Sequence, residues 1–226
     1  SLALASCVVA ALLLARNASA SCGQAFCTVD SRVGTEKPLA GGIIVGGRLK
    51  DKGKFAEALK NLVKEAKTPI RYAVISIPEH DIYLKLYSFP RTIGEEKMKE
   101  AMKAVVDLRL PSKPENFYAD WEKSQRSEEN LALLAALQKG TIDEYAAASL
   151  AAGVRPVAVE FHSLSAARVM KQEAGAAVML LSFYKDSVSV SVTHDKIINF
   201  RRSLPLSFFV EKGFLAAELR KISDFY

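Results

Sequence analysis

The sequence has little of what would indicate a membrane span or a disulfide framework. No window reaches the roughly 18 apolar residues that a spanning helix needs. The nearest run is LALASCVVAALLLA close to the start, which we expect to be a buried strand or helix rather than a signal peptide because no basic residue precedes it. The three cysteines, Cys7, Cys22 and Cys27, are odd in number and lack companion ligands. We therefore expect free thiols in a reducing compartment.

Catalytic and metal-binding motifs are also absent. The sequence contains no Walker A pattern, no GxGxxG and no HExxH, and no Ser or Cys stands in a nucleophile elbow. The three histidines, His80, His162 and His194, fall in separate segments without ligand spacing. Surface or core histidines are therefore favoured over a metal triad. The motifs give no support for catalysis.

The positive charge is concentrated in one part of the chain. Residues 48–113 hold 15 Lys and Arg against 9 Asp and Glu, a difference that equals the net charge of +6 for all 226 residues. No basic motif with interleaved aromatic residues, of the kind that binds nucleic acid, accompanies this excess. The sequence therefore argues against nucleic-acid binding and favours a solvated face or a surface for an acidic partner.

Hydrophobic periodicity predicts an α/β chain. Helical spacing is found over 54–67, 93–108, 141–153 and 163–170, with Met98 and Met102 on the apolar stripe of the second helix. Buried or alternating strands are predicted between these helices, at 71–78, 82–90, 131–137 and 155–161, and a further strand holds Phe117, Tyr118 and Trp121. Three more strands follow at 178–183, 188–192 and 197–201. Such alternation favours a mixed or parallel sheet with helices packed on it.

Five segments carry a resemblance to a known family: GGIIVGGRLKDKGKFAEALKNLVKEAK, YAVISIPEHDIYLKLYSFP, EEKMKEAMKAVVDLRLPSKPENFYADW, LLAALQKGTIDEYAAASLAAGVRPVAVE and INFRRSLP. In order and spacing, from about Leu39 to Pro205, they resemble the PilM family, actin-like proteins of type IV pilus assembly that are related to FtsA. The resemblance implies an actin-like (ribonuclease H-like) α/β lobe with an inserted FtsA/PilM-type α/β subdomain and a truncated second lobe. The expected parts are 1–81 and 153–175 for the first lobe, 82–152 for the insertion and 176–226 for the partial second lobe.

The resemblance also implies a partner and a place in the cell. Members of this family bind the N-terminal cytoplasmic peptide of PilN, an inner-membrane protein, in a groove beside the inserted subdomain. The chain would then be cytoplasmic, peripheral to the inner membrane, and would associate with other pilus assembly proteins and with itself. By the same resemblance, the peptide-contact residues expected here are Ile82, Leu84, Leu86, Leu108, Pro111, Phe117 and Tyr118. Plain core packing is the competing interpretation for Phe117 and Tyr118.

The resemblance fails at the residues that bind ATP and Mg²⁺ in actin-like proteins. The first hairpin, if it is Leu2–Leu14, has neither the family's Asp nor its Gly. The second phosphate loop would fall on Ser182, Tyr184, Asp186, Ser187 and Ser189. Ser182 stands where the Asp is expected and Tyr184 where the Gly is expected, and Ser189 replaces a later Asp. Tyr resists the positive φ that close approach to phosphate requires, and Ser cannot replace the carboxylate that orients hydrated Mg²⁺. No cofactor is therefore expected.

Three hypotheses follow. The first is a scaffold that binds a PilN-like peptide without hydrolysing ATP. The second is an active actin-like ATPase that uses Glu160, which lies near the family's carboxylate position at His162, together with Asp186 and Asp195. The third is a scaffold like GspL of type II secretion, which shares the fold.

Overall fold

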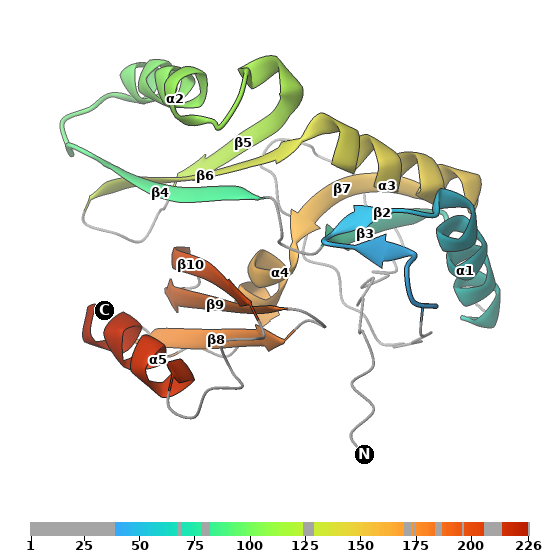
Figure 1. Cartoon of the computed structure of the whole chain (residues 1–226). Helices are drawn as coiled ribbons and strands as arrows, with labels where there is room; N and C mark the ends of the chain where they lie inside the picture. Colours follow the sequence, from blue (N-terminus) through green and yellow to red (C-terminus); the bar gives the residue numbers. More distant parts are fainter. Residues whose placement is uncertain are drawn as a thin grey trace. The chain divides into compact units, whose positions relative to one another are not determined.

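The computed structural model describes residues 39–66, 69–77, 82–123, 129–169, 173, 175–183, 187–195, 197–205 and 214–225 (Figure 1). They form two compact units. One contains β1, β2, α1, β3, α3 and β7, and we call it the β3–β7 unit. The other contains β4, α2, β5, β6, α4, β8, β9, β10 and α5, and we call it the β4–β10 unit. The three cysteines, His80 and the expected hairpin Leu2–Leu14 lie outside the described residues. Within the described residues, no helix is long and apolar enough to cross a membrane.

The β3–β7 unit begins with a tight hairpin. Strands β1 (Ile44–Val45) and β2 (Arg48–Leu49) pair antiparallel across Gly46 and Gly47, whose φ angles are 55° and 75°. Two consecutive positive φ angles are those of a type I′ turn, which glycine adopts without strain. Helix α1 (Lys52–Glu65) follows directly, and the carboxylate of Asp51 caps it by accepting a hydrogen bond from the backbone N–H of Lys54 at 2.9 Å.

A parallel strand pair forms the centre of this unit. Strand β3 (Tyr72–Ile77) pairs with β7 (Arg155–Phe161), the crossover geometry that the alternating pattern predicts. Helix α3 (Lys139–Ala151) precedes β7, and Gly153 follows its last turn with a φ of 81° and a backbone N–H that donates to the carbonyl of Leu150, which is the geometry of a glycine C-terminal cap. The buried hydroxyl of Tyr145 on α3 donates to the carbonyl of Gly47 at 2.9 Å, which joins the helix to the hairpin.

In the β4–β10 unit, the first sheet has the order β4 (Tyr83–Phe89), β6 (Asn130–Gln138), β5 (Phe117–Lys123), all antiparallel. Helix α2 (Glu95–Arg109) covers one face, as Figure 1 shows, and a short 3-10 turn, η1 (Pro114–Asn116), leads into β5. Met98 and Met102 of α2 are buried against Ala132 and Leu134 of the central strand. This confirms that the methionine stripe is core.

The second sheet of this unit has the order β8 (Ala177–Phe183), β9 (Ser187–His194), β10 (Ile197–Pro205). Helix α4 (His162–Val169) precedes it and α5 (Phe214–Phe225) follows it. Val190 and Val192 of the central strand pack with Ile222 and Leu219 of α5. The three strands predicted from the sequence are confirmed, and each is longer than predicted.

The two compact units divide the chain differently from the expected parts: α4 groups with the β4–β10 unit and not with the first lobe, and most of the expected insertion shares that unit with the expected second lobe. Helix α3 falls within the expected insertion 82–152, but the compact units place residues 140–151 with β3 and β7. The other expected boundaries stay a prediction.

Candidate functional site

The face of the β4–β6–β5 sheet that α2 does not cover brings together three of the predicted contact residues. Opposed residues of an antiparallel pair share a face, and successive residues alternate between faces. Leu84 and Leu86 oppose Ala135 and Leu133 of β6, and Tyr118 of β5 opposes Leu137. All these positions belong to one face, which we call the leucine face and define as Leu84, Leu86, Tyr118, Leu131, Leu133, Ala135 and Leu137.

The leucine face is apolar in the middle, and its β5 edge also carries the exposed Asp120 and Glu122, which oppose Ala135 and Leu133. Leu133 and Leu137 are buried, Leu84 and Leu86 are half-buried, and Tyr118 keeps 46% of its surface exposed. The ammonium of Lys139 lies 5.3 Å from the centre of the Tyr118 ring, a cation–π contact that holds the ring at the rim. Half-buried leucines beside an exposed aromatic ring suit the apolar side chains of a short peptide.

The structure does not bring the other predicted contact residues to this face. Phe117 opposes Gln138 and belongs to the α2 side of the sheet, where it is 94% buried; the core interpretation is correct for it. Leu108, at the end of α2, is 80% exposed, and Pro111 follows it in an exposed turn. Ile82 precedes β4 and is half-buried. A peptide on the leucine face would therefore contact only part of the predicted set.

The predicted phosphate-loop positions lie on β8 and β9. Ser182 and Ser203 both oppose Ser189, so three serines form a row across the sheet. Ser187 and Ser189 are buried, and Ser182 is half-buried. Tyr184 and Asp186 lie outside the described residues. The described hydroxyls are neutral groups within the sheet, whereas a phosphate loop needs open backbone N–H groups and a carboxylate for the metal ion.

The other carboxylates of the ATPase hypothesis do not converge on this turn. Asp195 follows β9 at the end opposite to the β8–β9 turn, and the eight residues of β9 separate the two by about 25 Å at the rise of an extended strand. Its side chain accepts a hydrogen bond from the backbone N–H of Gly175 at 3.1 Å. The same turn holds His194, whose Nε2 lies 3.1 Å from the carbonyl oxygen of Gly175. Asp195 therefore joins the end of β9 to the residues that precede β8.

Glu160 and His162 lie at the junction of β7 and α4, in different elements from the serine row. Within the described residues, no group of three or more His, Cys, Asp and Glu side chains could hold a metal ion.

The sequence reading missed a polar cluster on the α2 side of the sheet. Tyr83 and Tyr87 are four residues apart on β4, and their hydroxyl oxygens lie 2.7 Å from each other. Lys85 stands between them, with its ammonium 5.5 Å from the centre of the Tyr87 ring. The signal was present as Tyr-x-Lys-x-Tyr on an alternating strand, which puts all three side chains on one face.

Comparison with known proteins gives a family and a fold. The model of the family described as type IV pilus assembly protein PilM matches residues 23–206. No curated protein matches the sequence significantly. Among solved structures, the PilM–PilN type IV pilus biogenesis complex aligns with a TM-score of 0.65 and 20% identity, over 83% of this chain and 61% of that one. The chain thus spans less than two thirds of that relative's length.

A second solved structure is the cytoplasmic domain of EpsL, an inner-membrane component of the type II secretion system of Vibrio cholerae. It aligns with a TM-score of 0.48 and 12% identity, over 68% of this chain and 58% of that one. The alignment with the PilM–PilN complex confirms the predicted actin-like α/β class, because the two chains share a fold. Since the family model covers most of the sequence, the chain belongs to the PilM family of type IV pilus assembly proteins.

Proposed function

We propose that this chain is a scaffold of type IV pilus assembly that binds the N-terminal cytoplasmic peptide of a PilN-like inner-membrane protein and does not hydrolyse ATP. Family membership supports the pilus system over type II secretion. The similar solved structure is a complex of PilM with PilN, which supports a PilN-like partner. Through that partner the chain would be held at the inner membrane, on its cytoplasmic side, beside other pilus assembly proteins.

The leucine face is the surface that we propose for the peptide. The observation that carries this choice is the convergence of Leu84, Leu86 and Tyr118 from two strands onto one face, with Tyr118 exposed. An extended or turned peptide would place apolar side chains on the leucines and pack against the aromatic ring. Aromatic residues at the rim of such a surface often contribute most of the binding energy.

The proposed absence of ATP chemistry is supported by the described strands. Ser182 and Ser189 occupy positions where actin-like proteins need carboxylates, and both belong to the regular hydrogen-bonded sheet. A hydroxyl is a weak ligand for Mg²⁺ compared with a carboxylate. A calorimetric titration with Mg-ATP tests this part separately, and tight binding would overturn it.

Titration of a synthetic PilN-like N-terminal peptide into the full chain tests the scaffold. We expect saturable binding, weakened about tenfold or more by Tyr118→Ala, the size of a typical hot-spot loss. Leu108→Ala is the matched control, because Leu108 is more exposed than Tyr118 but lies outside the leucine face. Loss of binding with Leu108→Ala and none with Tyr118→Ala would move the site to the end of α2. No binding to the unaltered chain below about 1 mM would refute the scaffold itself.

A further inference from the structure

The polar cluster under α2 has an unbalanced set of hydrogen-bonding groups. The Tyr83 and Tyr87 hydroxyls share one hydrogen bond, so one phenolic proton stays available to a further acceptor. Lys85 adds an ammonium on the same face of β4. Arg109, the last residue of α2, adds a guanidinium whose charge acts on the Tyr87 hydroxyl. We call these four residues the tyrosine cluster.

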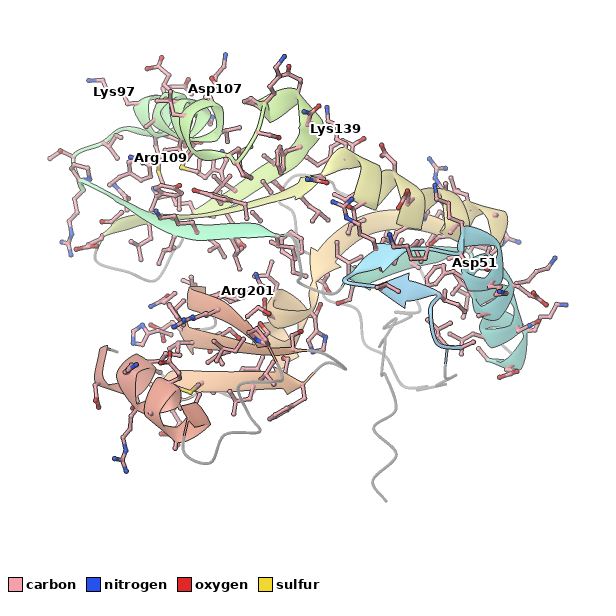
Figure 2. All side chains as sticks on the ribbon, viewed as in Figure 1. Asp51, Lys97, Asp107, Arg109, Lys139 and Arg201 are labelled. Atoms are coloured by element: carbon pink, nitrogen blue, oxygen red, sulfur yellow. The ribbon has the colours of Figure 1, made fainter. Side chains whose placement is uncertain are left out.

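The two cations of the cluster have no carboxylate partner among the described residues. Within the part of the chain that the structure describes, neither Lys85 nor Arg109 forms an ion pair, although Lys99 of the same helix pairs with Glu95 at 3.2 Å and with Glu96 at 3.4 Å. Figure 2 shows why the nearest acid of the helix does not help: Asp107 lies on the outer side of α2, with Lys97, whereas Arg109 lies on the side of the sheet. Among the described residues, two positive charges thus share a side of the sheet with a half-buried hydroxyl pair and have no carboxylate paired to them.

The tyrosines are built into the core, so their hydroxyls are held in place. Both rings pack against the cluster formed by Met98, Met102 and Leu134. Burial raises the pKa of the Tyr87 hydroxyl well above its usual value, and the hydrogen bond to Tyr83 acts in the same direction. Tyr87 is thus protonated at neutral pH. A fixed neutral donor beside two cations is complementary to a ligand that only accepts hydrogen bonds.

We propose that the tyrosine cluster binds a phosphate group. A phosphate monoester carries a charge of about −1.5 to −2 and three acceptor oxygens, which match two cations and one hydroxyl donor better than the single charge of a carboxylate does. Arg and Lys are also the residues that bind phosphate most often in proteins. The site lies on the α2 side of the sheet, the opposite face from the leucine face, so it is independent of the proposed peptide site.

Two sources could supply the phosphate: a soluble phosphate compound, or the headgroup of phosphatidic acid at the membrane surface. The experiment has one arm for each, both with the full chain. In the first, inorganic phosphate is titrated and binding is followed by calorimetry, with sodium acetate as the comparison anion. In the second, the chain is sedimented with phosphatidylcholine vesicles with and without phosphatidic acid.

We expect saturable binding in at least one arm, weakened about tenfold or more by Arg109→Ala and by Lys85→Ala, the size expected for a lost charge-assisted hydrogen bond. Lys99→Ala is the matched control: it removes another exposed cation that already has carboxylate partners, and it should leave binding unchanged. Tyr87→Phe should weaken binding by less than either charge removal, and circular dichroism would verify that this variant folds.

The outcome also identifies the source. Binding of inorganic phosphate alone supports a soluble ligand, and sedimentation only with phosphatidic acid supports a headgroup. Three results would overturn the proposal: no saturable binding in either arm, equal binding of acetate, or a loss with Lys99→Ala as large as that with Arg109→Ala.

Discussion

The two sheets of the β4–β10 unit have the same construction but differ in where their polar side chains lie. Each has three antiparallel strands, and each packs one face against a helix, α2 on the first and α5 on the second. The central strand β6 is apolar on both faces, and its sheet places polar groups at the rim, on the edge strands. The central strand β9 has valines on one face and hydroxyls on the other, and these hydroxyls are buried.

This difference decides which sheet is suited to binding. Tyr83, Lys85 and Tyr118 lie on edge strands of the first sheet, where a ligand can reach them. Ser189 and Ser191 lie on the central strand of the second sheet, with side chains only 2% exposed. Buried neutral hydroxyls stabilise a sheet, but they offer a ligand neither charge nor access. We therefore propose a binding role for the first sheet and a structural role for the second.

The largest expected effect comes from restoring a carboxylate to the serine row. Ser189→Asp would place a carboxylate at a position that is only 2% exposed, and we expect the free energy of unfolding to fall by about 3–5 kcal/mol. Urea denaturation at neutral pH measures this loss, with Ser189→Ala as the milder control. If Ser189→Asp were tolerated and gained Mg-ATP binding, the serine row would be an altered nucleotide site and the comparison above would fail.

Shortening one core side chain of β6 or β9 should lower the free energy of unfolding by less than Ser189→Asp does. The loss should be larger for β6 than for β9. Leu134→Ala removes a fully buried side chain that packs on Met98 and Met102, and we expect a loss of about 3 kcal/mol. Val190→Ala removes fewer atoms from the core against α5 and should cost about 2 kcal/mol. Denaturation of both variants by urea compares the sheets directly. Equal losses, or a larger one for Val190→Ala, would contradict the ranking.

The ion pairs that join α5 to β10 should stabilise the fold in a pH-dependent way. We expect no such dependence for the packing of α2. The Glu218 carboxylate accepts hydrogen bonds from Lys221 at 2.7 Å and from Arg202 of β10 at 2.9 Å. The hydrogen bond from Lys221, followed by the charges of Lys221 and Arg202, lowers the pKa of Glu218 below its ordinary value of 4.5. A lowered folded-state pKa stabilises the fold above the ordinary value, and this stabilisation is lost as the pH falls through the folded-state pKa.

Glu218→Gln should therefore be less stable than the unaltered chain at neutral pH, and the difference should shrink as the pH falls below the ordinary value. Thermal unfolding at a series of pH values measures it. Glu95→Gln on α2 is a suitable control, because its carboxylate is exposed and pairs with Lys99 on its own helix. A constant difference across the series would show that the ion pairs of Glu218 do not stabilise the fold.

The smallest expected effect is at the end of α2. Leu108 is 80% exposed, so Leu108→Ala should change the free energy of unfolding by no more than about 0.5 kcal/mol. A larger loss in urea denaturation would mean that this leucine is covered in solution, by a second copy of the chain or by another segment.

Much of the fold could be predicted because the periodicities are clear. The stripe of Met98 and Met102 and the Val–Ser alternation of β9 gave a helix and a strand, and the structure confirms both. The faces of β6 could not be assigned, because all residues between Asn130 and Gln138 are apolar and show no alternation. Without those faces, Phe117 and Tyr118 could not be separated, although adjacent residues of a strand must point to opposite sides.

The candidate sites were predictable only in part. Strand alternation alone predicted that Leu84 and Leu86 share a face. That Tyr118 of β5 lies on the same face follows only from the register of both strands with β6, which the structure supplies. The tyrosine cluster depends on Arg109, which lies 22 positions beyond Tyr87 and on a different element, so no local pattern indicated it. The family resemblance alone predicted that serines stand at 182 and 189 where carboxylates are expected. The structure adds that Ser189 is buried, so that a ligand has poor access to it.

The central claim is that the leucine face binds a PilN-like peptide without a nucleotide. The most direct test is a calorimetric titration of that peptide into the full chain, with and without Mg-ATP, repeated with Tyr118→Ala. We predict the same dissociation constant in both conditions and weaker binding to Tyr118→Ala in both. Binding that appears only with Mg-ATP, or binding that Tyr118→Ala leaves unchanged, would contradict the account.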